Sequence, residues 1–501
     1  MQMTTTGAIR TRWPFAPLPA VPLAHWATPA FTAVGIALWV LLAGLTNSGQ
    51  FADNIEQFVW AQSLEPGYWK HPPLPSWLLW AALKVFGFWS GWTYLLSAAC
   101  FCGTAFFGWR IAHRIAGARV AAIAVLLQGL HLGFSQRAEL YNHNTVVILF
   151  SAMTVWAALR ALDRSRLRDW ALVGACAGLA LLAKYQAAVI LGGIVLALAL
   201  SGEFRDRRVR LGCGWAVLVG LAVLAPHIAA VLGTEHSPVA YALSRFHEKS
   251  WDTVLQSMLG YFISQVRFHL PMVIAVALVA WTARRDSSHE GVRPADGAMA
   301  PARARAWMLG LVVWPLAFAT LLPLGSGMLL QAQWGLPTLQ FFVLYLAVKV
   351  AAALPRVPAV AFLRAVVCVQ LLSAVVFLGM PHPTDRRVDT AYPAQQVAMA
   401  VLRDWESATS CPLKFVAGPS FEAGLVSVYS GSYAKVLEEG DFRKSPWIDP
   451  MQMQRAGYVT MKRAVAISEE GQLARSNQGD WPAELSWTVV PPAMECEPGA
   501  R

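Results

Sequence analysis

The stretch DNIEQFVWAQSLEPGYWKHPPLPSW, residues 53–77, follows the first long apolar run of the chain at 28–46. It combines carboxylates, aromatic residues, a Lys-His pair and a Pro-Pro dipeptide, which is more than a turn between two helices requires. Asp53 is a candidate general base, although an Asp in this position can also cap a helix. Pro72-Pro73 forbids a continuous helix through the loop. We therefore interpret the stretch as one wall of an active site at a membrane surface.

The composition is that of an integral membrane protein. Of the 501 residues, 56% are hydrophobic and only 14% are charged, whereas soluble domains carry about 25% charged residues. Several apolar runs approach or reach the length that spans a bilayer. The candidate spans are 28–46, 94–110, 119–135, 145–162, 170–184, 186–202, 211–232, 268–283, 307–325, 333–349 and 365–380. The apolar segment 74–88 is short, and we interpret it as an interfacial helix.

The basic residues predict the orientation of these spans. With residues 1–27 in the cytoplasm, the inner loops hold 21 Lys and Arg residues, and the outer loops before residue 381 hold six. This is the bias of the positive-inside rule. The net charge of +11 therefore belongs to short loops, not to a nucleic-acid-binding face, and we expect no nucleic acid partner. The loop 47–93 and the tail 381–501 fall on the periplasmic side.

Further polar groups interrupt the apolar runs on this outer side. Glu139 and His143 are four residues apart and would share a face of a helix, a spacing that permits a divalent metal but offers too few ligands to assign one. Lys184 either snorkels to the interface or faces a phosphate. The segment 251–269 is amphipathic, which predicts a helix lying on the outer surface. Candidate phosphate contacts are Tyr68, Lys70, His71, Asn142, His143, Lys184, Tyr185, Arg245 and Arg267.

The tail predicts a small α/β domain. A helix is expected at 397–405, and short strands at 413–417, 425–429, 457–461 and 485–490. An oxidising compartment would allow Cys411 and Cys496 to form a disulfide. The seven cysteines show no metal-binding spacing.

Four motifs in order carry a resemblance to a known family. They are Asp53-Asn54, GYWKHPPLPSWLLWAALKVFG at 67–87, the polar cluster 139–144 and GLALLAKY at 178–185. The chain resembles the GT-C superfamily of membrane glycosyltransferases, in the branch of the protein O-mannosyltransferases and the lipid A aminoarabinose transferase. It looks still more like the rhizobial lipopolysaccharide galacturonosyltransferases, also in the tail segments VAGPSFEAGLVSVYSG, SPWIDP and GYVTM.

The resemblance implies a polyprenyl-phosphate sugar donor, a periplasmic acceptor and inversion at the anomeric carbon. By position, Asp53 would be the base that activates the acceptor, and Glu139 is the candidate for a second catalytic carboxylate. Lys70, His71 and Lys184 would lie near the donor phosphate, and Glu139, Asn142 and His143 would line the same cavity.

The chain also departs from the family pattern. Asn54 stands where the family often has an acid, and His71 where it has Lys before Pro-Pro. Lys70 replaces a Glu that helps to bind a metal in the aminoarabinose transferase. No metal site is therefore carried over. The cofactor stays open, with a divalent metal as one option.

The sequence thus predicts a polytopic α-helical membrane protein with about eleven spans and a GT-C-like fold, plus a small periplasmic α/β C-terminal domain. Residues 28–380 would form the catalytic module and 47–93 its periplasmic catalytic loop with the interfacial helix. In the bacterial inner membrane, it would transfer one sugar from a polyprenyl phosphate to lipid A or the lipopolysaccharide core, in contact with membrane lipids. The alternatives are a protein O-glycosyltransferase with the same donor type, a lipid or sugar transporter, and a non-catalytic envelope protein.

Overall fold

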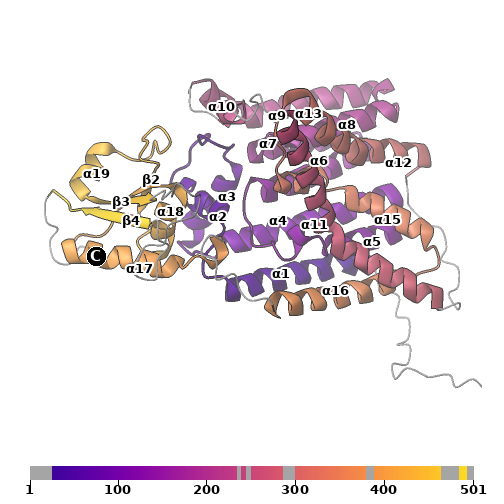
Figure 1. Cartoon of the computed structure of the whole chain (residues 1–501). Coiled ribbons are helices and arrows are strands. Elements are labelled where there is room, and N and C mark those ends of the chain that lie inside the picture. Colours follow the sequence, from indigo (N-terminus) through magenta and orange to yellow (C-terminus); the bar gives the residue numbers. More distant parts are fainter. Residues whose placement is uncertain are drawn as a thin grey trace, which may run out of the picture.

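The structure is a computed structural model that describes residues 25–233, 238–243, 250–285, 299–379, 389–463 and 485–493. A bundle of helices carries a small α/β domain at one end (Figure 1). Short elements lie between these two parts, among them α2 (Ala52–Trp60) and α3 (Leu74–Phe86). The candidate site is built from such short elements.

Within the described residues, seven helical segments are long and apolar enough to cross a membrane, or eight if one pair bent by 66° counts as a single span. One of the seven is a continuous segment in which a π-helical turn, Leu309–Val313, joins α12 to α13. The segments are α1 (Thr28–Thr46), α4 (Trp92–Ala116), α6 (His143–Arg164), α9 (Arg207–Leu232), α11 (Trp251–Arg285), α12 with α13 (Pro301–Met308, Trp314–Ser326) and α16 (Ala359–Gly379). The bent pair is Ala332–Thr338 with α15 (Phe342–Ala353).

Every one of the eleven apolar runs contains a helix, but three of these helices, besides the bent pair that contains α15, are short. They are α5 (Ala118–Gln128), α7 (Leu167–Ala183) and α8 (Ala187–Leu200), with 11, 17 and 14 residues. The structure thus confirms the positions of the runs, whereas a count of eleven spans stays a prediction. The run 119–135 is interrupted, because α5 ends at Gln128 and a separate 3₁₀ turn, Leu132–Phe134, follows.

The helix expected at 251–269 is present, but it does not end there; its place on the outer surface stays a prediction. These residues form the first part of α11, which continues through Pro271 to Arg285. Large apolar side chains such as Leu255, Leu259 and Ile263 are exposed along this part. An apolar surface of this kind suits contact with lipid, and the amphipathic pattern alone did not show that the helix continues.

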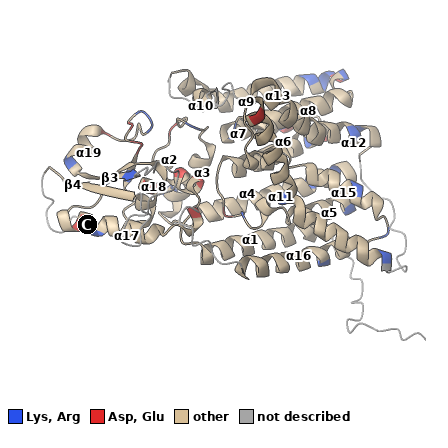
Figure 2. Ribbon diagram, viewed as in Figure 1, with Lys and Arg blue, Asp and Glu red and all other residues tan. Residues whose placement is uncertain are grey.

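Glycines let helices of the bundle approach closely. A Cβ added to Gly174 on α7 would collide with the backbone of Ala216 on α9, and Gly193 on α8 meets the backbone of Gly310 in the π-helical turn. Small residues at such contacts are typical of helix packing in membranes. The basic side chains gather mainly at the end of the bundle that lies away from the α/β domain (Figure 2).

The remaining short helices connect these elements. They are the 3₁₀ turns His25–Ala27, Glu203–Arg205, Ala332–Trp334 and Asp389–Ala391, with α10 (Pro238–Leu243) and α14 (Gly335–Thr338).

The tail forms a four-stranded sheet in the order β2-β1-β3-β4. β1 pairs in parallel with β2 and β3, and β3 pairs with β4 in the antiparallel direction. The elements are α17 (Ala394–Ala408), β1 (Phe415–Gly418), α18 (Ser420–Tyr429), β2 (Lys435–Glu438), α19 (Pro450–Ala456), β3 (Tyr458–Arg463) and β4 (Leu485–Val490). The predicted α/β character, the helix and three of the four strands are confirmed.

The strand predicted at 425–429 is instead the second half of α18, and β2 was missed. Helix α18 is buried on nearly every side over 422–428, so its apolar residues follow no helical stripe. Burial on all sides is the case in which periodicity cannot separate a strand from a helix.

The α/β domain holds α2 directly. Trp60 Nε1 donates to Glu438 Oε2 at 2.8 Å, and Tyr433 Oη donates to the Phe58 carbonyl at 2.7 Å. At the other end of α2, the Ala52 amide donates to Asp389 Oδ2 at 2.9 Å. Both regions contribute to one hydrophobic core. The predicted domain boundary at 380 lies outside the described residues.

Cys411 takes part in a disulfide. Its expected partner Cys496 lies outside the described residues, so the pairing of these two residues stays a prediction.

Candidate functional site

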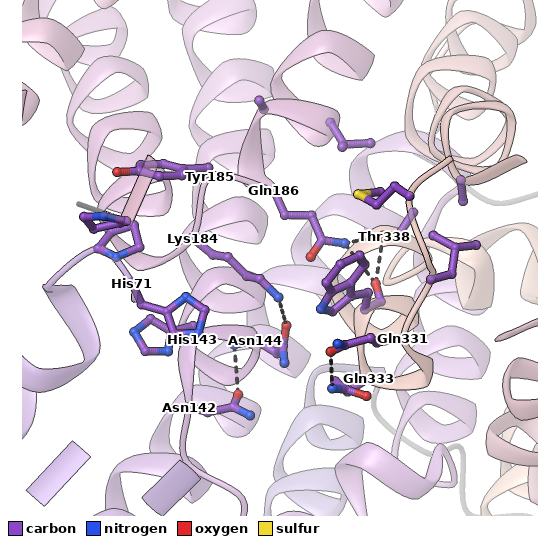
Figure 3. Close-up of a pocket in the computed structure, with 18 of the residues that line it drawn as sticks. His71, Asn142, His143, Asn144, Lys184, Tyr185, Gln186, Gln331, Gln333 and Thr338 are labelled. Carbon is purple, nitrogen blue, oxygen red and sulfur yellow. Dashed lines mark hydrogen bonds between the residues drawn. The ribbon is translucent and has the colours of Figure 1, made fainter. Parts of the chain in front are cut away.

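A cavity of about 510 Å³ opens where several short elements meet. Its walls come from α2, from the residues before α3, from the start of α6, from the α7–α8 loop and from residues 328–338. Figure 3 shows His71 and His143 on one side of this space and Gln331 and Gln333 on the other, with Lys184 directed toward Asn144 between them. Seven of the eleven predicted site residues line it, namely Asp53, Lys70, His71, Asn142, His143, Lys184 and Tyr185.

Asp53 lies in the first turn of α2, where a carboxylate interacts favourably with the helix dipole. Asn142 Nδ2 donates to Asp53 Oδ2 at 2.7 Å. The Asn142 side-chain oxygen caps α6 by accepting from the amides of Asn144 and Thr145 at 2.8 and 3.1 Å. The cap fixes the orientation of the Asn142 amide, and the amide in turn orients the carboxylate of Asp53.

Asn54 is a structural bridge. It is fully buried, its Nδ2 donates to the Glu139 carbonyl at 3.0 Å, and its Oδ1 accepts from the Tyr141 amide at 2.8 Å. An ionised acid could not donate to the carbonyl. The departure from the family pattern at this position therefore has a local physical reason.

Lys70 and Glu56 form an ion pair, with 2.6 Å between Nζ and Oε2. Burial raises the pKa of Glu56 to about 7, while Lys70 beside it acts in the opposite direction. For Lys70, burial is outweighed by Glu56, and its pKa is raised. Much of the charge of Lys70 is thus compensated before any ligand enters.

Lys184 has a different environment. It follows the last residue of α7, and its Nζ donates to Asn144 Oδ1 at 2.6 Å and lies 5.5 Å from the Trp334 ring centroid. In the described part of the chain, no carboxylate forms a salt bridge with it. Burial lowers the pKa of Lys184 to about 7, and Asp53 acts in the opposite direction, as an incoming anion would. Lys184 is therefore better suited than Lys70 to bind an anion.

His71 and His143 lie face against face, with ring centroids 4.1 Å apart and planes at 36°. The Trp60 ring meets both of them edge-on, at 6.1 and 5.8 Å. With Glu56, the two histidines form a group of metal-type ligands whose donor atoms lie within 4.8 Å of one another.

The other predicted residues lie elsewhere. Tyr68 is buried against Trp60 and donates to the Ser63 carbonyl, which is a structural role. Glu139 is buried, is not among the residues that line the cavity, and has one carboxylate oxygen without a hydrogen-bond partner. Arg267 is exposed on α11, and Arg245 lies outside the described residues.

Tyr185 connects the cavity to a neighbouring loop. Its hydroxyl forms a hydrogen bond of 2.7 Å with His227 Nε2 on α9, and His227 Nδ1 lies 2.7 Å from the Pro66 carbonyl. The loop before Lys70 is thereby tied to the helix bundle.

Sequence reasoning missed one side of the cavity. Gln331, Gln333 and Trp334 lie opposite the histidines, and Gln186 Nε2 donates to the Trp334 carbonyl at 3.0 Å. The cluster QAQW at 331–334, inside an otherwise apolar run, was the available signal. The remaining wall is apolar and aromatic, with Tyr241, Tyr261, Trp314, Phe318, Leu322, Met328 and Leu330.

Comparisons with known proteins agree with this architecture. The family model described as dolichyl-phosphate-mannose-protein mannosyltransferase matches residues 70–229. Two proteins of Rhizobium johnstonii are similar to the chain. The lipopolysaccharide core galacturonosyltransferase RgtA is 26% identical over 35% of this chain and 36% of its own length. The lipid A galacturonosyltransferase RgtD is 25% identical over 49% of this chain and 52% of its own. The matched parts thus span between about a third and half of these relatives.

A solved structure extends the likeness to the fold of the whole chain. The crystal structure of ArnT from Cupriavidus metallidurans bound to undecaprenyl phosphate has a TM-score of 0.57, at 14% identity, over 93% of this chain and 98% of that one. These comparisons support the resemblance predicted above: parts of the chain are similar in sequence to membrane glycosyltransferases, and its fold is similar to that of ArnT.

Proposed function

We propose that the protein transfers a single sugar from a polyprenyl-phosphate donor to lipid A or the lipopolysaccharide core at the periplasmic face of the inner membrane. The observation that carries the proposal is one cavity that combines a carboxylate, Asp53, and a cation, Lys184, with an apolar wall. A sugar phosphate suits the polar side, and a prenyl chain suits the side with Phe318 and Leu322. The basic residues at the far end of the bundle (Figure 2) support an outward-facing site.

The chemistry follows from this arrangement. Asp53, held by Asn142 at 2.7 Å, accepts the proton of the acceptor hydroxyl, whose oxygen attacks the anomeric carbon of the donor. The bond between that carbon and the phosphate oxygen breaks, and polyprenyl phosphate leaves with the electron pair. Lys184 stabilises the charge that develops on this phosphate. A single displacement of this kind inverts the anomeric configuration.

The identity of the relatives guides the choice of donor. Both rhizobial proteins are named galacturonosyltransferases, so a galacturonic acid is the first sugar to test. The family description names a protein mannosyltransferase instead, which keeps a protein acceptor as the second candidate.

The test uses the full-length protein in membranes with a radiolabelled polyprenyl-phosphate galacturonic acid and a parallel mannose donor. Lipid A, lipopolysaccharide core and a Ser/Thr peptide serve as acceptors. Label in lipid A or core, with the anomeric configuration inverted, is the expected result. Label in the peptide alone would favour the protein O-glycosyltransferase, and the absence of transfer to any acceptor would overturn the proposal.

A further inference from the structure

Three ligand-type side chains converge from segments that are far apart in the sequence. Glu56 comes from α2, His71 from the residue before Pro72-Pro73, and His143 from the first position of α6. Their donor atoms lie within 4.8 Å of one another. The spacing of Glu139 and His143 had suggested another pair, but the structure brings His143 to Glu56 and His71 instead.

His143 itself requires an explanation. It is 3% exposed, and its Nε2 has no hydrogen-bond partner. A buried polar atom without a partner is unfavourable, because it has lost its hydrogen bond to water and gained none in the protein. The other ring nitrogen interacts with the backbone of Pro72, which has only a carbonyl to offer. A proton on that nitrogen would leave the lone pair of Nε2 for a metal, as in histidines whose second nitrogen is fixed by a carbonyl and whose first binds a metal.

The chemistry of the three ligand side chains favours one class of metal ion. Glu56 Oε2 accepts from Lys70, so the local charge of the carboxylate is partly balanced and its second oxygen supplies one ligand. Two imidazoles supply the others. Mg²⁺ and Ca²⁺ prefer oxygen ligands, whereas imidazole suits Zn²⁺ and its neighbours in the first transition row. Two histidines and one carboxylate, with a fourth position free for a ligand, form a common catalytic zinc set.

We propose that Glu56, His71 and His143 bind one Zn²⁺-type ion at the wall of the cavity. Trp60 packs against both imidazoles, so the apolar side is closed and the remaining coordination position faces the cavity that the three ligands line. When bound, such an ion would add positive charge where a phosphate oxygen enters. That last role rests on the proposed function, whereas the metal site does not.

The experiment measures metal binding directly on the full-length protein in detergent. After treatment with a chelator and its removal, the protein is titrated with Co²⁺, read by visible absorption, and with Zn²⁺, read by competition and by elemental analysis. The variants are His143→Gln and Glu56→Gln. The control is His269→Gln, because His269 also packs against another imidazole, that of His131 at 4.8 Å, but is not one of the residues that line this cavity.

One ion per chain, with absorption typical of low coordination number, is expected for the wild type. Loss of a ligand should weaken binding by more than the roughly 10–100-fold that loss of an outer partner causes, while the control binds as the wild type does. Absence of binding in the wild type, or equal binding by all four proteins, would overturn the site. If His143→Gln fails to fold, Glu56→Gln decides.

Transfer activity is recorded separately on the same samples. A protein that binds the ion through these residues but transfers no sugar retains the metal site and contradicts the proposed function. A protein that transfers sugar but binds no ion contradicts the metal site and retains the proposed function.

Discussion

Helices α2 and α9 show two kinds of segment in one molecule. Helix α2 has nine residues, residues 54–60 are all buried, and its side chains form hydrogen bonds to partners far away in the sequence. Helix α9 has 26 residues, and only 17% of its apolar window is buried. The groups suited to chemistry lie on short elements such as α2 or, like His143, at the first position of a long helix. Both the helix bundle and the α/β domain hold these elements in place.

Asp53 on α2 provides the strongest test of this difference between short, buried elements and long, apolar helices. We expect Asp53→Asn to lower transfer by about 10²–10⁴-fold, the usual contribution of a general base, with expression and folding retained. Initial rates at saturating donor provide the measurement. Asp163→Asn, at the opposite end and paired with Arg114, is the matched control and should transfer normally. Near-normal transfer by Asp53→Asn would remove this residue from the mechanism.

The buried carboxyl group of Glu139 should make the stability of the folded protein depend on pH. Burial raises the pKa of Glu139 to about 7 from 4.5, so the folded state holds its proton more tightly than the unfolded state. Stability from this group is therefore complete below about pH 4.5 and falls as the pH rises to about 7, by about 3 kcal/mol in all.

Glu139→Gln should abolish this dependence. The difference in thermal stability between the variant and the wild type should grow from pH 4.5 to 7 and then stay constant. The exposed Glu406 on α17 serves as control in Glu406→Gln. A difference that does not change with pH would show that Glu139 keeps its ordinary pKa.

The two lysines of the cavity, Lys184 and Lys70, should respond differently to substitution. Lys184→Gln should weaken the use of the donor by about 10–100-fold, because a charged hydrogen bond to phosphate contributes about 1.5–3 kcal/mol. The loss should appear in kcat/KM for the donor and not in KM for the acceptor. Lys84→Gln, an exposed position on α3, should have no effect. A larger loss in Lys70→Gln than in Lys184→Gln would reverse the assignment.

The smallest expected effect concerns the long helices. Gly174→Ala should lower stability by about 1–3 kcal/mol, because the added methyl group meets the backbone of Ala216. Gly214→Ala on α9, where a Cβ would meet nothing within 4 Å, is the control. Thermal unfolding in detergent checks both. KM for the donor should stay unchanged in both, and an altered KM in Gly174→Ala would show that α7 and α9 do more than support the site.

Much of the candidate site could be predicted from the order of polar motifs along the sequence. Asp53, Lys70, His71, Asn142, His143 and Lys184 line one cavity, because each stands at the end of an apolar run on the same predicted side. Helices were also placed correctly at the apolar runs. What the sequence could not supply is contact between distant residues. Nothing in the spacing of Glu56, His71 and His143 indicates that they meet. Gln333 and Trp334 fell inside the run 333–349 that was taken as a span, and Gln331 lay just before it.

Burial explains two places where the expectations from sequence and the structure differ. Helix α18 was taken for a strand, because its burial against Ile55 and Val59 removes any polar face. Glu139 was proposed as a second catalytic carboxylate by its position in the family order. The structure buries it beside Asn54, away from the residues that line the cavity, and a catalytic role for it stays a prediction.

The hydrogen bond between Trp60 and Glu438 joins residues 378 positions apart. Ribosomes add roughly 5–20 residues per second, so the loop that carries Asp53 is made tens of seconds before the strand that holds it. During that interval α2 lacks its partners Glu438, Tyr433 and Asp389. The nascent protein therefore acquires its complete site only when its last part has been made and folded, and a chain that ends early lacks those contacts.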